Sequence, residues 1–264
     1  ATSATDSDMP SILRLTSSSL CTCSLVRCDN ASTSVCSTCE CWWVRTLAVM
    51  TAQRAGAAIG RRKLHGDLIH RKAMAAQGAP KRVLVLGGGD GMAVREVLRH
   101  PSVEQVTLVE LDPAMTRLFS EDARLLALNA GALKHPKVRV INADAFVWLG
   151  SHDEVFDAIV VDFPDPTNHA IGKLYSTTFY ALLDQHLAAG GFAVIQTTSP
   201  LIARKSFWTV VSTIESVGLQ ATPYHAHVPS FGEWGFILAS RRPWHWPTAL
   251  PEGLRFLDVA GLPA

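Results

Sequence analysis

Apolar runs and amphipathic stretches alternate along the chain from Pro80 onward, and this alternation predicts a series of strands and helices. A strand buried on both faces of a sheet reads as a short continuous apolar run. Such runs predict strands over residues 82–86, 105–110, 138–142, 156–162 and 192–197. Helical character predicts helices over 92–100, 113–128, 175–188 and 203–217, the last two ended by Gly190-Gly191 and Gly218. Two more strands follow each other without a helix between them, at 219–224 and 234–239.

Strands that alternate with helices predict an α/β fold with a mostly parallel, doubly wound sheet and helices on both faces. The final two strands predict an antiparallel edge, because no helix connects them. We therefore assign residues 79–264 to one Rossmann-like domain. Residues 1–78 are interpreted as an atypical N-terminal segment, partly disordered or helical, since its Ser, Thr, Cys and Arg residues follow no clear period.

All 6 cysteines lie in the N-terminal segment, between Cys21 and Cys41. The pair Cys36 and Cys39 has a spacing that zinc sites use. The remaining cysteines lack the second regular pair of a structural zinc site, so a reduced, irregular segment is the favoured interpretation. No metal is predicted for this protein.

The 264 residues carry 24 basic and 23 acidic side chains, a net charge of +1, which disfavours nucleic acid as a partner. The apolar stretch 42–60 is interrupted by Arg45 and Arg54, whereas a spanning helix needs about 20 predominantly apolar residues. The N-terminus also lacks the pattern of a signal peptide. The sequence thus predicts no membrane segment and a cytoplasmic location.

A glycine-rich loop follows the first predicted strand and precedes a helix. Gly87, Gly89 and Gly91 in this loop allow sharp turns and a close approach of a ligand. Asp90 adds a negative charge to the same loop, where a phosphate-binding loop presents backbone N–H groups or lysine. The loop therefore indicates a nucleoside with a cationic tail rather than a nucleotide phosphate.

Four more carboxylates lie at or just after the ends of the next three strands, where parallel sheets bind their ligands. Glu110 follows Gly87 at about the 20-residue offset of a ribose-binding acid, although a solvated loop acid is the alternative. Asp144 has two interpretations that do not exclude each other: it accepts a hydrogen bond from an adenine amino group, or it caps the helix that follows it. Asp162 and Asp165 flank Pro164 in a stiff loop, and paired acids there can bind a cation or accept a proton; a simple turn is the alternative.

The combination of these motifs resembles the spermidine synthase family of polyamine aminopropyltransferases, in a bacterial branch with a Phe-Pro-Asp-Pro motif. The resemblance covers about residues 80–240. The matching stretches are 87–91, 95–100, 109–112, 144–145, 162–166, 174–175, 179–180, Gln196 and 232–236.

This resemblance implies a Rossmann-like sheet of the class I methyltransferase type and an aminopropyl transfer that makes spermidine from putrescine and releases methylthioadenosine. The donor would be decarboxylated S-adenosylmethionine, used as a co-substrate, and the acceptor a small-molecule diamine. By position, the glycine loop and Asp90 bind the donor, Glu110 its ribose, and Asp144 with Ala145 its adenine. Asp162 is implied to be the catalytic base. The implied substrate-binding residues are Asp165, Gln196 and Trp234.

Two other functions stay open at the level of the sequence. The same fold serves methyltransferases that use S-adenosylmethionine, but Asp90 would repel the carboxylate of that donor. Residues 1–75 do not resemble the N-terminal region that lines the polyamine pocket in the family, so an inactive nucleoside-binding relative is also considered. The resemblance leaves a homodimer open as the assembly.

Overall fold

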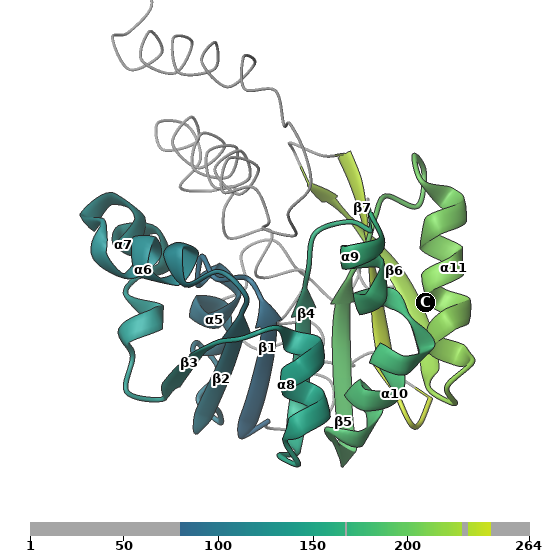
Figure 1. The fold of residues 1–264 in the computed structure, drawn as a ribbon, viewed down its shortest axis with the longest axis horizontal. Helices are drawn as coiled ribbons and strands as arrows, with labels where there is room; N and C mark the ends of the chain where they lie inside the picture. The colour runs from purple at the N-terminus through teal and green to yellow at the C-terminus, as the bar shows by residue number, and fades with distance from the viewer. Residues whose placement is uncertain (1–79, 167, 229–231, 244–264) are drawn as a thin grey trace, which may run out of the picture. The chain divides into compact units, whose positions relative to one another are not determined.

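One mixed sheet organises the protein in the computed structural model, which describes residues 80–166, 168–228 and 232–243 (Figure 1). The strand order across the sheet is β3-β2-β1-β4-β5-β7-β6. The strands are β1 (Arg82–Gly87), β2 (Gln105–Glu110), β3 (Val138–Asn142), β4 (Phe156–Asp162), β5 (Leu187–Gln196), β6 (Gln220–Val228) and β7 (Gly232–Ser240). The predicted segment 1–78 and its cysteines lie outside the described residues.

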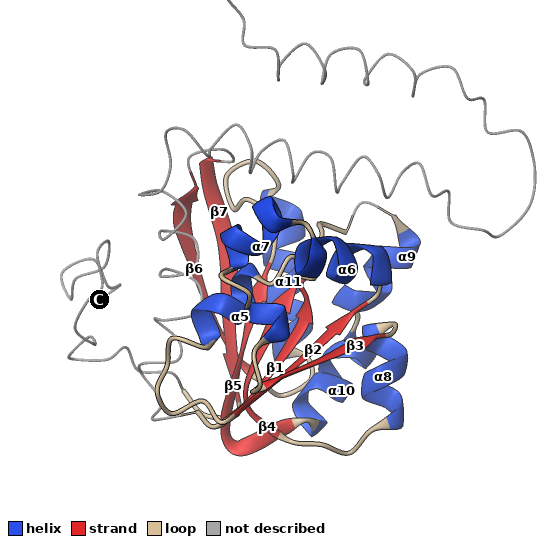
Figure 2. Cartoon of the chain, turned by 90° about the vertical axis from the view of Figure 1, so that its left-hand side faces the viewer, coloured by secondary structure: helices blue, strands red, loops and turns tan. Residues whose placement is uncertain are grey.

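Helices cover both faces of the sheet (Figures 1 and 2). They are α5 (Met92–Val97), α6 (Pro113–Glu121), α7 (Ala123–Asn129), α8 (Ala145–Ser151), α9 (His169–Gly172), α10 (Thr177–Gln185) and α11 (Arg204–Glu215), with 3₁₀ turns η3 (Ala132–Lys134) and η4 (Lys173–Tyr175). Leu84 and Leu86 of β1 pack in the core formed with α8, α10 and α11. Val83 and Val85 pack on the opposite face with α5, α6 and η3. Because both faces of β1 are buried, its apolar run is continuous.

The predicted α/β fold is confirmed. Strands β1 to β5 pair in parallel, whereas β7 runs antiparallel to both β5 and β6. The antiparallel strand is therefore next to the edge, and β6 forms the edge itself. None of the helices in the described part of the chain has the length and apolar character needed to cross a bilayer.

The predicted single helix over 113–128 is wrong, because α6 and α7 are separated at Asp122. This residue adopts an extended conformation with φ −68° and ψ 118°, and its carboxylate accepts a hydrogen bond from the Arg124 N–H. An aspartate that caps a new helix in this way competes with continuation of the preceding one.

The prediction that Gly190-Gly191 ends a helix is also wrong. Helix α10 ends at Gln185, and both glycines lie inside β5, where the pairing with β4 shifts between Phe156 and Ala158. A Cβ at Gly191 would lie 3.0 Å from the carbonyl oxygen of Phe156. Gly191 thus serves a close strand contact at an irregularity rather than a helix end, whereas Gly190 has open space where a Cβ would lie.

Two solvent-facing glycines allow a matched test of the local backbone. Gly218, just after α11, has φ +91° and open space where a Cβ would lie, so Gly218→Ala meets backbone strain alone. We expect a loss of about 1 kcal/mol in the free energy of unfolding. Gly150 lies in α8 with equally open space, and Gly150→Ala is expected to gain about 0.5–1 kcal/mol. Urea denaturation measures both; the same sign for the two variants would contradict this assignment.

Candidate active site

The carboxyl ends of the parallel strands place the predicted acids in one row. Gly87 pairs with Asp162, and Glu110 pairs with Asn142. The registers of β1 with β2 and of β4 with β5 continue this row to Glu110 and Gln196. Alternation along the strands puts Glu110, Asp162 and Gln196 on the same face of the sheet, the face that carries α5.

Glu110 is held by the backbone of the glycine loop. Its Oε2 accepts a hydrogen bond of 2.9 Å from the Gly89 N–H, and its Oε1 accepts one of 2.9 Å from the Asp112 N–H. A Cβ at Gly89 would lie 2.5 Å from Glu110 Cγ. Glycine is therefore required at position 89 by the approach of this acid.

The side chains of Asp90 and Asp162 flank the same loop. Asp90 Oδ1 accepts a 2.9 Å hydrogen bond from the Met92 N–H at the start of α5. A Cβ at Gly88 would lie 3.0 Å from Asp162 Oδ2, so Asp162 lies directly against the loop. The structure brings Glu110, Asp90 and Asp162 together, and we call these three residues the acidic cluster.

Burial and mutual repulsion make the acidic cluster hard to ionise. Burial raises the pKa of Asp162 from 3.8 to about 7, and the charges of Asp90 and Glu110 contribute in the same direction. Burial, opposed by the Met92 hydrogen bond, raises the pKa of Asp90 to about 6, with a further contribution from Glu110. Within the described residues, no Lys or Arg forms an ion pair with any member of the cluster.

The loop after Asp162 is fixed by two side chains from other elements. The Tyr175 hydroxyl donates a 3.1 Å hydrogen bond to the carbonyl oxygen of Pro164. The Gln196 side-chain amide donates to the carbonyl oxygen of Phe163 at 3.3 Å. Gln196, predicted to bind substrate, therefore holds the loop beside the acidic cluster, and direct contact with a substrate stays a prediction.

Asp165 lies half-buried on this loop. Burial raises its pKa, and a hydrogen bond with the Thr198 side chain partly offsets that effect. Burial raises the pKa of the Tyr175 hydroxyl, and the negative charges of Asp165 and Asp162 raise it further. Both acids are therefore close enough to Tyr175 to affect its ionisation. Asp165 therefore extends the acidic lining beyond the cluster, and its role with an acceptor stays a prediction.

Asp144 caps α8, as one of its two interpretations predicts. Its Oδ1 accepts hydrogen bonds from the N–H groups of Phe146 and Val147, and its Oδ2 accepts a 2.6 Å hydrogen bond from Lys173 Nζ. Partial burial disfavours the charge of Asp144, but these bonds outweigh burial and lower its pKa. Ala145 is the buried first residue of α8. The adenine contact predicted for Asp144 and Ala145 stays a prediction.

Trp234 lies near the start of β7, at the edge of the sheet where β5 ends. Gln196 pairs with Phe236, and the Thr197 N–H donates to the carbonyl oxygen of Gly235. Trp234 is two positions before Phe236 on β7 and packs against the core on the α5 face. It is thus on the same face as the acidic cluster, but contact with a substrate stays a prediction.

Sequence reasoning missed three side chains that complete this region, namely Lys173, Thr198 and Asn129. Lys173 follows a glycine in a short helical turn, and only its distance from Asp144 in space gives it a role. Thr198 is the second residue after the end of β5. Residues that follow a parallel strand reach the ligand edge of the sheet, so its position in the sequence could have indicated a role.

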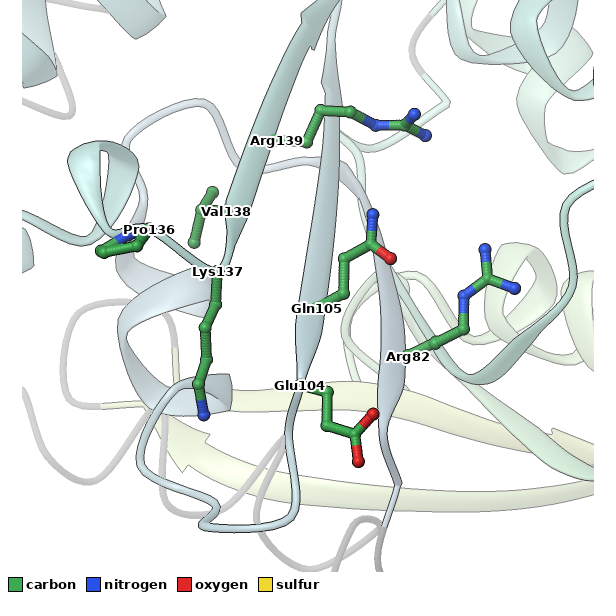
Figure 3. A pocket seen from close by; sticks show the side chains of 7 residues that line it. All are labelled: Arg82, Glu104, Gln105, Pro136, Lys137, Val138 and Arg139. Carbon is green, nitrogen blue, oxygen red and sulfur yellow. The ribbon is translucent and has the colours of Figure 1, made fainter.

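A surface cavity of about 400 Å³ lies away from these acids. It lies at the amino ends of β1, β2 and β3 and is lined by Arg82, Glu104, Gln105, Pro136, Lys137, Val138 and Arg139 (Figure 3). Ligands of such sheets bind at the opposite, carboxyl ends. In the part of the chain that the structure describes, His, Cys, Asp and Glu side chains form no group of three or more arranged to hold a metal ion.

The comparison with family models decides the family. Residues 63–245 match the spermine/spermidine synthase domain. The chain belongs to this family. The spermine/spermidine synthase domain accounts for all seven strands of the described sheet.

Relatives of known name agree with this family. The chain is 50% identical over 200 residues to a polyamine aminopropyltransferase of Leptospira interrogans, a match that covers 76% of this chain and 40% of the relative. It is 52% identical over 199 residues to polyamine aminopropyltransferase 2 of Ralstonia nicotianae, with 75% and 39% covered. The chain thus spans about two fifths of the length of these curated relatives of the spermine/spermidine synthase family.

Solved structures of the spermine/spermidine synthase family share the fold. A spermidine synthase in complex with the transition-state analogue AdoDATO aligns with a TM-score of 0.62 at 26% identity, over 68% of this chain and 61% of that one. Spermidine synthase from Thermotoga maritima aligns with the same TM-score at 25% identity, over 68% and 60%.

The raised pKa of Asp162 predicts a pH-dependent penalty on the free protein. Folding raises this pKa from 3.8 to about 7, so the native state binds the proton more tightly, and stability falls as the pH rises across that range. Replacing the carboxylate by an amide removes the penalty. Asp162→Asn is expected to raise the free energy of unfolding by about 4 kcal/mol at pH 8 and to leave it nearly unchanged at pH 4.

Chemical denaturation at the two pH values measures this effect. Asp153→Asn, at an exposed carboxylate, serves as the matched control and is expected to change little at either pH. A less stable Asp162→Asn variant at pH 8 would show that the ionised form of Asp162 has a stabilising partner, contrary to the acidic cluster.

Proposed function

We propose that this chain transfers an aminopropyl group from decarboxylated S-adenosylmethionine to a diamine, putrescine first among them, and releases methylthioadenosine. The observation that carries the proposal is the acidic cluster at the carboxyl end of the sheet. Three carboxylates that lack an ion-paired partner among the described residues favour a guest with positive charges. The membership in the spermine/spermidine synthase domain family supports the same chemistry.

The donor is proposed to lie along the row of strand ends. Glu110, fixed by two backbone N–H groups, presents its remaining lone pairs to the ribose hydroxyls. Asp90, one residue after Gly89, receives the ammonium at the end of the aminopropyl group. Asp144 has one oxygen at the N-terminus of α8 and accepts from the adenine amino group beside Ala145. This order places the neutral base beside the Lys173-paired acid and the cationic tail beside the unpaired acids.

The acceptor is proposed to enter beside Asp162 and Asp165. Asp165 binds the far ammonium of the diamine, and Gln196 and Trp234 line the path of its apolar chain. The position of Asp165 next to Asp162 supports this arrangement, because both acids act on the pKa of Tyr175. A diamine between the two acids would present one nitrogen to Asp162.

Asp162 is proposed to be the catalytic base. The attacking amine must first lose a proton, because a primary amine has a pKa near 10. Asp162 accepts that proton, the nitrogen lone pair forms a bond to the aminopropyl carbon next to the sulfonium, and the carbon–sulfur bond breaks. The electron pair of that bond stays on sulfur, which leaves as the thioether of methylthioadenosine. A carboxylate with a pKa of about 7 is well matched to this task near neutral pH.

Positioning supplies the rest of the rate. The sulfonium already makes its neighbouring carbon electrophilic, so the protein has to hold the amine in line behind the departing sulfur. Holding two reactants in such a geometry contributes several kcal/mol to a reaction of this kind. The cytoplasmic location and the homodimer stay expectations of the sequence and are not required for these steps.

A turnover assay tests the proposal. The full chain is incubated with decarboxylated S-adenosylmethionine and a panel of diamines, and methylthioadenosine is detected. Wild-type turnover is expected with at least one diamine. Asp162→Asn is expected to lose about 10²–10⁴-fold in kcat, the usual contribution of a positioned base. The donor is still expected to bind this variant, with a Kd raised by no more than about tenfold, because the donor's charge also acts on Asp162.

Two results would contradict the proposal. One is near-normal turnover of Asp162→Asn, with Asp153→Asn as the control for an exposed acid. The other is a preference for S-adenosylmethionine over its decarboxylated form in calorimetric titrations, which would favour a methyltransferase.

A further inference from the structure

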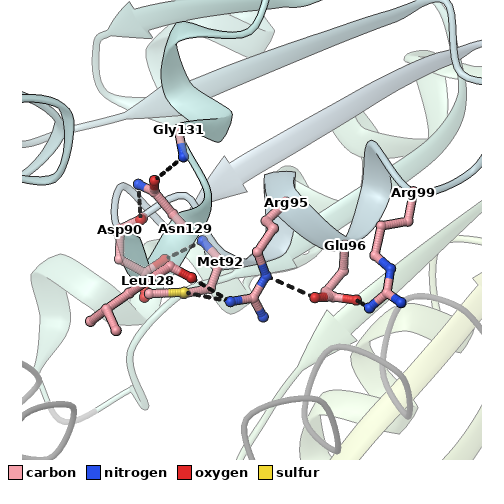
Figure 4. Close-up of polar contacts among 8 residues, drawn as sticks. All are labelled: Asp90, Met92, Arg95, Glu96, Arg99, Leu128, Asn129 and Gly131. Atoms are coloured by element: carbon pink, nitrogen blue, oxygen red, sulfur yellow. Dashed lines mark hydrogen bonds and ion pairs between the residues drawn. The ribbon is translucent and has the colours of Figure 1, made fainter. Parts of the chain in front are cut away.

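Asn129 connects the glycine loop to the helices beside it (Figure 4). It is the last residue of α7 and is fully buried, with 0% of its surface exposed. A buried amide is costly unless it is hydrogen-bonded. The placement of Asn129 thus depends on the partners that its side chain finds.

Those partners come from three separate segments. The Asn129 side-chain N–H groups donate to the carbonyl oxygens of Asp90 and Phe119, each at 3.0 Å. Its side-chain oxygen accepts a 3.0 Å hydrogen bond from the Gly131 N–H. One side chain therefore links the loop that carries Asp90, helix α6 and the turn after α7.

The backbone around this contact is shaped to allow it. A Cβ at Gly91 would lie 3.0 Å from Asn129 Nδ2 and 2.9 Å from Leu133 Cγ, so the glycine makes room for the amide. Ala130, directly after Asn129, adopts a left-handed conformation with φ 54°, which is unfavourable for alanine. Such a conformation persists only where surrounding contacts hold it in place. The hydrogen bonds of Asn129, the preceding residue, are the contacts that hold Ala130.

The end of α7 is itself anchored to α5. Arg95 donates a hydrogen bond of 2.5 Å to the carbonyl oxygen of Leu128, and its Nε pairs with buried Glu96 at 2.8 Å (Figure 4). Asn129 is therefore held on a rigid base and can act as a fixed point for the loop.

We propose that Asn129 is a positioning residue that fixes the Asp90 carboxylate for the cationic tail of the donor. Its hydrogen bond holds the carbonyl oxygen of Asp90 toward the protein interior, while the Asp90 carboxylate caps the N–H of Met92 at the start of α5. Without the amide, the backbone at Asp90 gains freedom, and the carboxylate loses its defined position. This inference rests on the proposed function, because it assigns Asp90 to the aminopropyl ammonium.

Two ligands separate a positioning role from a merely structural one. Decarboxylated S-adenosylmethionine carries the ammonium that Asp90 would bind, whereas methylthioadenosine shares its nucleoside but lacks that group. Asn129→Ala in the full chain is expected to raise the calorimetric Kd for the donor about tenfold. This factor corresponds to the free-energy contribution of about one hydrogen bond. The Kd for methylthioadenosine is expected to change less than about twofold, and kcat at saturating donor less than about threefold.

Phe119→Leu is the matched control. It removes packing from the core on the α5 face but keeps the carbonyl oxygen that the amide binds, so it lowers the melting temperature while the Asn129 hydrogen bonds are kept. Its donor Kd is expected to equal that of the wild type. If Asn129→Ala is not folded at the assay temperature, Asn129→Ser repeats the test. Serine keeps a polar group at this buried position but is too short to replace the hydrogen bonds of the amide.

Several results would overturn the inference. Equal weakening of both ligands, an unchanged donor Kd, or unfolding of both Asn129 variants under conditions where Phe119→Leu stays folded would each indicate a purely structural role. A wild-type chain that fails to bind the donor at all contradicts the proposed function and this inference with it. A wild type that binds, with an Asn129 variant that binds equally well, contradicts the inference alone.

Discussion

Bringing Asp90, Glu110 and Asp162 within electrostatic reach of one another is unfavourable, because burial and like charge both oppose their ionisation. The pKa of Asp162 rises to about 7 and that of Asp90 to about 6 for these reasons. A fold tolerates such a cluster when the stability of its core is sufficient, and here apolar strands are buried on both faces. The free protein therefore holds an electrostatic cost that a cationic ligand relieves.

The glycines of the loop make this crowding sterically feasible. A Cβ would lie 2.5 Å from Glu110 at Gly89 and 2.9 Å from Leu133 at Gly91, both too close, and 3.0 Å from the Asp162 carboxylate at Gly88. The glycine-rich loop, which the sequence analysis interprets as space for a ligand, thus also makes space for the side chains of Asp162, Glu110 and Asn129. The ligand and the acids use the same edge of the sheet, so the two requirements coincide.

The acid at the end of the site proposed for the adenine differs from the acidic cluster, because it has an ion-paired partner. Asp144 is paired with Lys173, whose segment follows the loop that carries Asp165. The row of strand ends is consequently polarised, with a neutralised acid at one end and unpaired acids at the other. This polarity supports the proposed orientation of a donor that has a neutral base and a positive tail.

The sequence predicted the central strands well, because a strand buried on both faces reads as a continuous apolar run, but it missed residues 187–191 of β5 and 225–228 of β6. It also predicted which acids meet, because parallel strands present their carboxyl ends at one edge, as Glu110 and Asp162 do. The helix over 113–128 was wrong because Asp122 prefers to cap a new helix, a choice that apolar periodicity does not record. Asn129 was missed for a related reason, since nothing in its neighbours shows that its partners come from three separate segments.

The number of protons released when the donor binds is the sharpest test of the acidic cluster. Calorimetry of decarboxylated S-adenosylmethionine at pH 6.5, in buffers of different ionisation enthalpy, gives this number. With pKa values of about 6 and about 7, Asp90 and Asp162 together hold about one proton at that pH in the free protein. A cation bound between them should expel most of it, so we predict a release of about one proton. Binding with no proton release, or with uptake, would contradict an acidic cluster that accepts the positive charge of the donor.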